Sequence, residues 1–514
     1  MLARITSAAV LGIDAYLVDV ETDIANGLPS FATVGLPQGA VKEGRERVNS
    51  AIHNAGYLFP LKRITVNLAP ADIRKDGSAF DLPIALGVLA ATGQVDLGRA
   101  RGYVVMGELG LDGEIRPVRG ALSMAVAAEQ AGCAGLILPS ANVCEAAVVK
   151  ALDVRGAGTL ADVVHHLDGG RTLARAEVDV AALFAERAQG DVDFCEVKGQ
   201  EHAKRALEVA AAGAHNILLV GPPGSGKTML ARRLPTILPG MSLAEALETT
   251  KIHSVAGMLP AGESLIAARP FRAPHHTISD AGLIGGGSYP RPGEVSLAHN
   301  GVLFLDELPE FRKNVLEVLR QPMEDGSVTL SRAAMTLSFP ARVMLAAAMN
   351  PCPCGYFADP LRTCSCTAAL VRHYLARVSG PLLDRIDLHL EVPAVRYREL
   401  SDERSGEPSA AIRERVARSR EIQQERFALR RGVFANAHMA PRDIRACCRL
   451  SAAADAILRT AIARLGMSAR AYHRVLKIAR TIADLAGAAA IEPAHVGEAI
   501  QYRTLDRAPG GTGG

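Results

Sequence analysis

Residues 221–228 read Gly221-Pro222-Pro223-Gly224-Ser225-Gly226-Lys227-Thr228 and fit the Walker A pattern G-x-x-x-x-G-K-[ST] at every fixed position. The apolar run 216–220 before this stretch predicts a buried strand, and residues 228–234 after it predict a helix. Glycines let backbone N–H groups turn toward a phosphate, and a helix N-terminus adds the positive end of its dipole. The stretch therefore predicts a nucleotide-binding loop in an α/β domain.

Four side chains in and after this loop have expected roles in binding and hydrolysing ATP. Lys227 would reach the β- and γ-phosphates, and the Thr228 hydroxyl would bind Mg²⁺. The apolar run 301–305 ends in two acids, which is the pattern of a Walker B strand. Asp306 would hold Mg²⁺, directly or through water, and Glu307 would orient and polarise the attacking water.

Asn350 follows another mostly apolar run, residues 342–349, and therefore ends a third predicted buried strand. Its side-chain amide suits a sensor-1 role, in which a polar group positions the lytic water near the γ-phosphate. The alternative is an asparagine that only begins a turn before Pro351.

Two arginine positions suit the remaining parts of such a site. Arg385 suits an arginine finger, which a neighbouring subunit supplies to stabilise transition-state charge, although a surface ion pair with Asp384 or Asp387 is the alternative. Arg470 opens a predicted helix and suits sensor 2, with Arg474 one turn later as the competing choice. Two solvated arginines on a helix face are the alternative for this pair.

Length, charge and apolar content limit the classes of protein to which the chain can belong. The chain has 514 residues, of which 49% are hydrophobic, and a formal net charge of +3, so charge alone does not indicate a nucleic-acid binder. The length predicts about three or four domains. No apolar run approaches the roughly 18 residues that span a bilayer, and the start lacks the pattern of a signal peptide. We expect a cytoplasmic protein with no membrane partner.

The pattern along the chain predicts an order of domains. Alternating runs at 15–21 and 63–68 predict strands, and Ala-rich runs at 82–91 and 121–131 predict helices. The expected parts are an α+β domain at 1–168, a linker at 169–190, the nucleotide-binding core at 191–395, a mainly helical part at 396–506 and a disordered tail at 507–514.

Four of the nine cysteines cluster as C-x-C, nine residues, C-x-C, namely Cys352, Cys354, Cys364 and Cys366. Four thiolates can make a tetrahedral Zn²⁺ site, and all four positions would then be filled, so the metal would be structural. The usual zinc knuckle is C-x-x-C, so this spacing departs from it. Paired disulfides or free thiols are the alternatives.

The order of Walker A, Walker B, sensor 1, arginine finger and a helical part with sensor 2 resembles an AAA+ ATPase. Segments 269–277 and 292–301, between the Walker motifs, resemble the magnesium-chelatase-like branch. Residues 1–505 resemble the YifB/ComM family of bacterial proteins, also through segments 34–43 and 66–72. The resemblance implies an AAA+ αβα P-loop core, an N-terminal Lon-protease-like (S5 domain 2-like) α+β domain and a C-terminal helical lid.

The resemblance also implies a function. The family's role is ATP-driven branch migration of DNA during natural transformation, by a homohexameric ring. ATP and Mg²⁺ would be the cofactors, DNA the partner, and no small molecule besides ATP the substrate. A chelatase-like motor subunit, an ATP-dependent adaptor for a protein partner and an ATP-dependent protease are the other functions that such a chain suggests.

Two segments resemble the DNA-contacting loops of this branch. The glycine-rich insert 282–291, which contains Tyr289 and Arg291, resembles its helix-2 insert. Residues 328–332 and 335–339 alternate apolar and polar side chains, which predicts a hairpin with Arg332 near its tip. Arginine contacts to phosphate are independent of sequence, which suits a motor. The alternative is a hairpin used only for subunit packing.

The N-terminal part resembles a Lon-type protease in which a Ser–Lys dyad is expected. Ser78 falls near the place of the nucleophile, but Leu122 falls where the dyad lysine belongs. Because leucine cannot accept a proton, we expect an inert site. Lys75 and Lys42 are the only substitutes that the sequence suggests.

Overall fold

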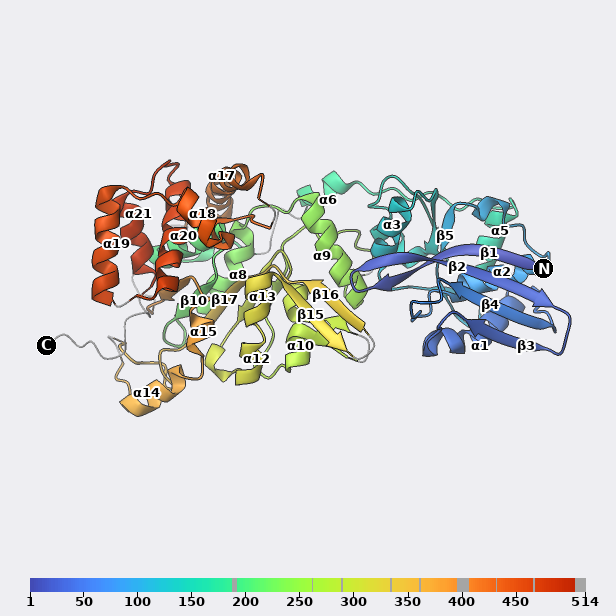
Figure 1. Ribbon diagram of the computed structural model, residues 1–514, viewed down its shortest axis with the longest axis horizontal. Helices are drawn as coiled ribbons and strands as arrows, with labels where there is room; N and C mark the ends of the chain where they lie inside the picture. Colours follow the sequence, from blue (N-terminus) through green and yellow to red (C-terminus); the bar gives the residue numbers. More distant parts are fainter. Residues whose placement is uncertain are drawn as a thin grey trace. The chain divides into compact units, whose positions relative to one another are not determined.

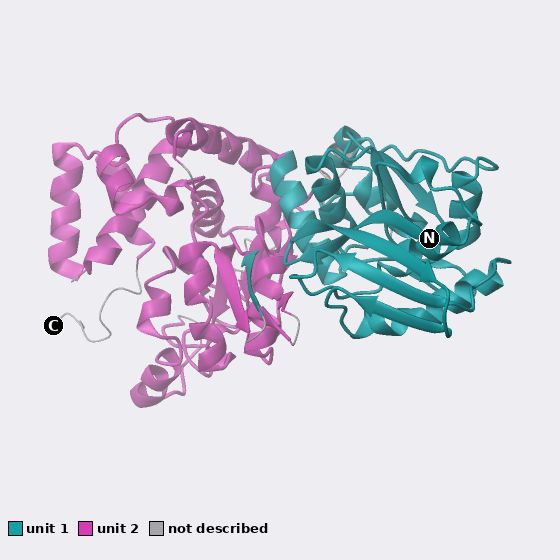
Figure 2. Cartoon of the chain, turned by 45° about the vertical axis from the view of Figure 1, so that its right-hand side comes forward, with its two compact units in different colours: residues 1–186, 243–267, 333–339 teal, residues 187–242, 268–332, 340–514 magenta. Residues whose placement is uncertain are grey.

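The computed structural model describes residues 1–186, 192–260, 262–287, 290–332, 335–359, 362–394, 406–430, 432–465 and 467–503 (Figure 1). Contacts divide the chain into two compact units (Figure 2). Unit 1 consists of residues 1–186, 243–267 and 333–339, and unit 2 contains the rest of the chain. Unit 1 therefore includes two segments that lie in sequence within the predicted nucleotide-binding core. The domain boundaries predicted from the sequence stay predictions.

Unit 1 is built on a seven-stranded mixed sheet of order β3-β4-β2-β1-β5-β8-β9. The long strands β1 (Leu2–Leu11) and β2 (Asp14–Ala25) pair antiparallel, with β4 (Arg63–Ala69) antiparallel to β2 and the edge strand β3 (Ser30–Val34) parallel to β4. The remaining neighbours pair in parallel and comprise β5 (Tyr103–Val105), β8 (Gly135–Pro139) and β9 (Asp153–Ala157). The strands predicted at 15–21 and 63–68 are confirmed.

Helices of unit 1 follow from long apolar runs. In α2 (Asp81–Ala91) nearly every residue is buried, and α2 packs against β1, β2 and α1 (Gly39–Asn54). The helix α3 (Ala121–Gln130) packs against β2 and against α9 (Leu243–Ala256), which belongs to the same unit. The two Ala-rich runs that predicted helices are thus confirmed. The predicted linker contains one further helix, α6 (Val180–Glu186).

Unit 2 is built on a five-stranded sheet of order β11-β14-β17-β10-β18, in which every neighbouring pair is parallel. Its strands are β10 (Ile217–Val220), β11 (Phe271–Arg272), β14 (Val302–Leu305), β17 (Met344–Met349) and β18 (Leu388–Glu391). The three central strands are fully buried, as their continuous apolar sequence predicts. Helices α7 (Glu201–Gly213) and α8 (Lys227–Ile237) share the apolar core with this sheet.

The C-terminal part is helical, as predicted, and its apolar side chains belong to the same core as the parallel sheet. Among the described residues it contains α17 (Ser409–Phe427), α18 (Pro441–Cys447), α19 (Ala452–Leu465), α20 (Ala469–Leu485) and α21 (Pro493–Gln501). Helices α17 and α20 pack on α7. The predicted tail at 507–514 lies outside the described residues.

Two short ladders in the chain correspond to the predicted substrate loops. β15 (Ser327–Arg332) and β16 (Met335–Pro340) pair with each other, which confirms the predicted hairpin. β12 (Gly285–Gly286) and β13 (Arg291–Pro292) pair antiparallel within the glycine-rich insert. Within the described part of the chain, no helix combines the length and the apolar character needed to cross a bilayer.

Candidate nucleotide-binding site

The site lies at the carboxyl edge of the parallel sheet in unit 2. Three neighbouring strands end there, and each is followed by one predicted motif: β10 by the loop 221–226, β14 by Asp306 and Glu307, and β17 by Asn350. Because the strands are parallel and adjacent, their carboxyl ends bring together motifs that are far apart in sequence, such as Lys227 and Asn350, which are hydrogen-bonded although 123 residues separate them.

Lys227 begins α8 and is 8% exposed. Its Nζ donates to the carbonyl oxygens of Gly221 at 2.7 Å and Pro222 at 2.8 Å, and to Oδ1 of Asn350 at 3.3 Å. Burial lowers the pKa of Lys227, and the nearby Asp306 carboxylate partly offsets this effect. These oxygens surround the ammonium group as phosphate oxygens would, so the arrangement fits the predicted role of Lys227.

Thr228 and Asp306 meet directly, since the Thr228 Oγ1 donates to the Asp306 Oδ2 at 2.6 Å. A hydroxyl and a carboxylate side by side at a phosphate-binding loop are the donor set that holds Mg²⁺ in P-loop sites. The other Asp306 oxygen accepts from the backbone N–H of Glu307 at 2.9 Å, which fixes the orientation of the carboxylate. The residues present therefore fit a bound Mg²⁺.

Glu307 has a backbone φ of +53°, a left-handed conformation that is unfavourable for a glutamate. Such strain is concentrated at functional sites, where surrounding structure maintains it. The Glu307 side chain is 58% exposed, and its Oε2 lies 3.2 Å from Nδ1 of His276, whose ring contacts that of His275 in a tilted arrangement with centroids 4.1 Å apart. The turn therefore presents this carboxylate outward, where a water molecule can reach it.

Two residues at this edge were not predicted to take part. His276 contacts Glu307, and Gln200 donates from Nε2 to the carbonyl oxygens of Ser225 at 2.8 Å and Pro393 at 3.2 Å. Gln200 also has a left-handed φ of +55°. No local sequence pattern predicts a role for Gln200 at this site. His276 belongs to segment 269–277, which supports the family resemblance but indicates no role for this histidine.

The predicted arginines lie at the amino edge of the same sheet, opposite the phosphate-binding loop. Asp387 directly precedes β18, and Arg474 forms an ion pair with its carboxylate. Burial alone would raise the pKa of Asp387, but Arg474 and His215 outweigh it and hold that pKa far below its usual range. Arg470 is 66% exposed and lies 3.6 Å from Asp384.

Arg385 is only 11% exposed and forms an ion pair with Glu324 of the same chain. Its Nη1 also donates to the Pro381 carbonyl at 2.7 Å. Among the described residues, the Nε atoms of Arg385 and Arg474 have no hydrogen-bond partner. Both side chains line a pocket of about 510 Å³, together with Arg342 and others. The structure thus places these arginines together, but away from the loop 221–228 of their own chain.

Arg291 and Arg332, predicted to contact DNA, are both exposed and flank the same short strand. Arg291 pairs with Gly286 across the β12–β13 ladder, and a Cβ on Gly286 would lie 3.6 Å from Nη2 of Arg332. The insert and the hairpin strand β15 therefore bring two cations to one place. Tyr289, the third residue predicted there, lies outside the described residues.

Comparison with known proteins places this geometry in a family. Residues 193–400 match the family described as magnesium chelatase, subunit ChlI, residues 20–142 match subunit ChlI of Mg-chelatase, and residues 406–503 match its C-terminal family. The chain is 45% identical to competence protein ComM of Haemophilus influenzae over 98% of each chain, and 43% identical to the uncharacterized protein YifB of Escherichia coli over the same shares.

The chain belongs to the ComM/YifB family of magnesium-chelatase-like proteins. Membership in the ComM/YifB family suggests an AAA+ ATPase that uses ATP and Mg²⁺. A shorter match, 32% identical over 154 residues, covers 27% of the chain and 26% of Lon protease 2 of Bacillus subtilis. That match suits the Lon-like assignment of the N-terminal part, which in detail stays a prediction.

Among the described residues, no lysine is hydrogen-bonded to Ser78, the nucleophile position of the Lon-like site predicted for this ComM/YifB member. The Ser78 hydroxyl donates to the Glu108 carboxylate. Lys75 is fully buried, and its Nζ has no hydrogen-bond partner among the described residues. Leu122, at the expected position of the dyad lysine, is also fully buried. A neutral base able to take the Ser78 proton is therefore missing from the immediate contacts of the hydroxyl.

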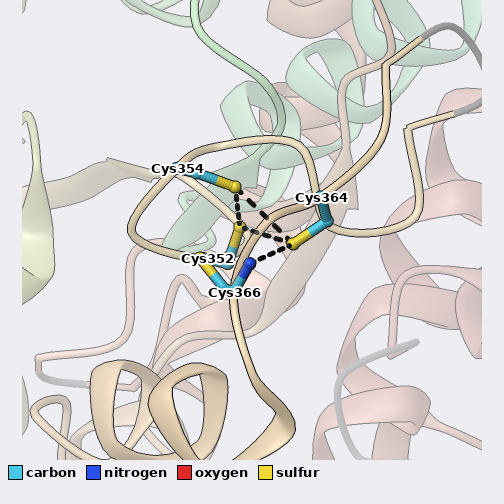
Figure 3. Close-up of side chains that lie close together, drawn as sticks. All are labelled: Cys352, Cys354, Cys364 and Cys366. Atoms are coloured by element: carbon cyan, nitrogen blue, oxygen red, sulfur yellow. Dashed lines mark hydrogen bonds between the residues drawn. The ribbon is translucent and has the colours of Figure 1, made fainter.

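The four predicted cysteine ligands of this ComM/YifB member converge in unit 2 (Figure 3). Their sulfurs all lie within 4.8 Å of one another, with separations of 3.3 Å, 3.7 Å and 3.5 Å among Cys352, Cys354 and Cys364. Sulfurs bound at about 2.3 Å around a tetrahedral Zn²⁺ would be about 3.8 Å apart, whereas disulfide sulfurs are about 2.05 Å apart. The cluster therefore fits a metal better than it fits disulfides.

Proposed function

We propose that the protein is an ATP-hydrolysing hexameric DNA motor, a branch-migration helicase acting in the cytoplasm during natural transformation and recombination. The observation that carries the ATPase part is the gathering of Lys227, Asn350 and the Thr228–Asp306 pair at one sheet edge. The DNA part is supported by family membership, because a relative of 45% identity carries the name competence protein.

Within one subunit, each side chain would take one task. Lys227 would hold the β- and γ-phosphates, and Thr228 and Asp306 would hold Mg²⁺, which neutralises phosphate charge when bound. Glu307 would accept a proton from the attacking water, because its carboxylate is exposed beside the Walker B aspartate. Asn350, held against Lys227 at 3.3 Å, would orient that water.

The arginines would act on a neighbouring subunit. Arg385, Arg470 and Arg474 lie at the amino edge of the sheet, so they are turned away from the loop 221–228 of their own chain. A ring that places this edge against the next subunit's nucleotide would bring Arg385 to its γ-phosphate as an arginine finger, with Arg470 or Arg474 as sensor 2. Arg385 would have to leave its ion pair with Glu324 to reach that phosphate.

DNA would be held by the insert and the hairpin strand. Arg291 and Arg332 are exposed and flank Gly286, where the absence of a side chain leaves room for a close approach of the phosphate backbone. Two arginines at one place provide sequence-independent phosphate contacts, which a motor moving along any DNA needs. Tyr289, which the family resemblance also assigns to DNA contact, lies outside the described residues.

The four-cysteine cluster would hold a structural Zn²⁺. The donor set and the sulfur separations suit tetrahedral coordination with no open position. Metal analysis of the purified protein should then find about one zinc per chain.

The test is ATP-dependent branch migration on a synthetic three-strand junction, comparing the wild-type protein with Lys227→Ala. Movement by the wild type alone would support the motor, and Arg332→Ala should then slow movement while leaving basal ATP turnover unchanged. Absence of movement by a wild-type protein with active ATP turnover would contradict the DNA part of the proposal.

A chelatase-like motor subunit is the second candidate, because all three family descriptions that match the chain name a magnesium-chelatase subunit. Such a motor, like an ATP-dependent adaptor, would act on a protein partner. Stimulation of ATP turnover by DNA separates the two functions, since only the DNA motor should turn over faster when junction DNA is added.

A further inference from the structure

The turn that carries the first two cysteines packs directly on the phosphate-binding loop. Gly355 has a φ of +87°, and a Cβ at this position would lie 2.4 Å from Cδ and 2.7 Å from Cγ of Pro223. Only glycine permits both this conformation and this approach. The Gly355 N–H donates to the Cys352 carbonyl at 3.0 Å, so the turn and its contact with Pro223 form one unit.

The helix that follows the cysteine cluster also contacts the ATP site. α14 (Ala368–Leu375) begins directly after Cys366, and the Thr367 hydroxyl caps it by accepting from the Leu370 N–H at 3.2 Å. Tyr374 of α14 is buried, and burial raises the pKa of its hydroxyl to about 12, an effect that the neighbouring backbone N–H of Asn350 partly offsets. Asn350 is thus held between Lys227 on one side and the helix that follows the cluster on the other.

The four sulfurs need a cation to stay together as thiolates. The backbone N–H of Cys366 donates to the Cys364 sulfur at 3.4 Å. Such N–H donors stabilise metal-bound thiolates. A bound metal would bond to all four sulfurs, which lie within 4.8 Å of one another, and so tie the turn of Cys352 and Cys354 to the segment of Cys364 and Cys366. Loss of the metal removes these bonds and should therefore loosen the turn that presses Gly355 against Pro223.

We propose that metal binding at the four-cysteine cluster controls the ATP site, because the metal-bound cluster holds the phosphate-binding loop through Gly355 and Asn350 through Tyr374. The inference rests on the proposed ATPase function and names a regulation of that site. A protein without the metal should bind ATP weakly even though Lys227, Thr228 and Asp306 are all present.

The experiment measures nucleotide affinity and metal content in the same full-length samples. Zinc is released from the wild-type protein with a reversible mercurial, chelated and removed, and the thiols are then reduced. The affinity for a fluorescent ATP analogue is measured in excess Mg²⁺ before and after Zn²⁺ is added back. We expect affinity to fall roughly tenfold to hundredfold without zinc, because small displacements of binding groups have effects of that size, and to recover with Zn²⁺.

Three variants separate the effect of the metal from the effect of the contact between Gly355 and Pro223. Cys354→Ser with Cys364→Ser should lose zinc and affinity together, whereas Cys447→Ser, a thiol outside the cluster, should keep both. Gly355→Ala should keep zinc and still weaken the nucleotide, because its new methyl group would displace Pro223. Circular dichroism and thermal unfolding verify that each sample is folded.

Unchanged affinity in a folded, zinc-free wild-type protein would overturn the inference, and so would a wild-type protein that binds no zinc. Neither result would touch the proposed ATPase function. Conversely, a zinc-loaded wild type that binds the analogue but never hydrolyses ATP would contradict the proposed function and leave the dependence of binding on zinc intact.

Discussion

Lys227 in unit 2 and Lys75 in unit 1 are both buried, 8% and 0% exposed, and burial lowers the pKa of each. They differ in their partners. Lys227 donates to oxygens of Gly221, Pro222 and Asn350, whereas Lys75 has no hydrogen-bond partner among the described residues. Burial alone therefore does not indicate a functional lysine. The surrounding hydrogen-bond acceptors determine whether the ammonium charge is stabilised and positioned for a ligand.

The largest effect should come from removing the partnered lysine. Lys227→Ala deletes the cation that holds the β- and γ-phosphates, so ATP turnover should fall below detection. Lys75→Met is the matched control and should leave turnover near the wild-type level. A phosphate-release assay on both variants tests the comparison directly, and loss of turnover in the Lys75 variant would reverse it.

Arg385→Ala should lower turnover by about 10³-fold, the effect of losing an arginine finger. If the finger acts in trans, mixing Arg385→Ala with Glu307→Gln subunits should restore part of the activity, since some interfaces then contain both groups. Arg372→Ala, an exposed arginine on α14, is the control. Mixtures that stay inactive, in assemblies verified as hexameric, would refute action in trans.

Glu307→Gln should lower turnover by roughly 10²–10⁴-fold, the contribution of a general base, while ATP still binds. Glu310→Gln, at an exposed acid paired with Arg377, should have little effect. Turnover and equilibrium binding of a fluorescent ATP analogue are measured for both variants. A Glu307 variant that keeps full turnover would remove this residue from the catalytic site.

Lys75→Met should stabilise the protein, because it replaces a buried amine that lacks a partner with an apolar chain of similar length. The expected gain is about 1–3 kcal/mol, seen as a higher unfolding temperature in thermal scans. Lys42→Met, at an exposed position of α1, should change stability by less than about 0.5 kcal/mol. A lower unfolding temperature for the Lys75 variant would reveal a partner of this lysine.

The smallest effect should come from Ser78→Ala. The Ser78 hydroxyl donates to Glu108 and has no lysine beside it, so neither ATP turnover nor casein degradation should change. If the wild-type protein degrades casein and the Ser78→Ala variant does not, the predicted inert site in unit 1 would be contradicted.

Much of the site could be predicted because its motifs are local. The phosphate-binding loop, the acids after residues 301–305 and Asn350 each follow a buried strand, and parallel strands bring their carboxyl ends to one edge. Arg385 illustrates the limit, because the alternative to its predicted arginine-finger role was an ion pair with Asp384 or Asp387, its neighbours in sequence. Its observed ion-pair partner is Glu324, which only the packing of distant segments brings near.

The sequence by itself determined the chemistry: which residues can bind phosphate, hold Mg²⁺ or ligate zinc, because side-chain chemistry and spacing within one strand and turn are local properties. Only the tertiary structure decided which of these groups meet. It placed the arginines and the phosphate-binding loop at opposite ends of the parallel strands, left Lys75 without an acceptor among the described residues, and set Gly355 of the cysteine cluster against Pro223. Contacts between distant segments depend on how all the elements pack, and no local pattern records that packing.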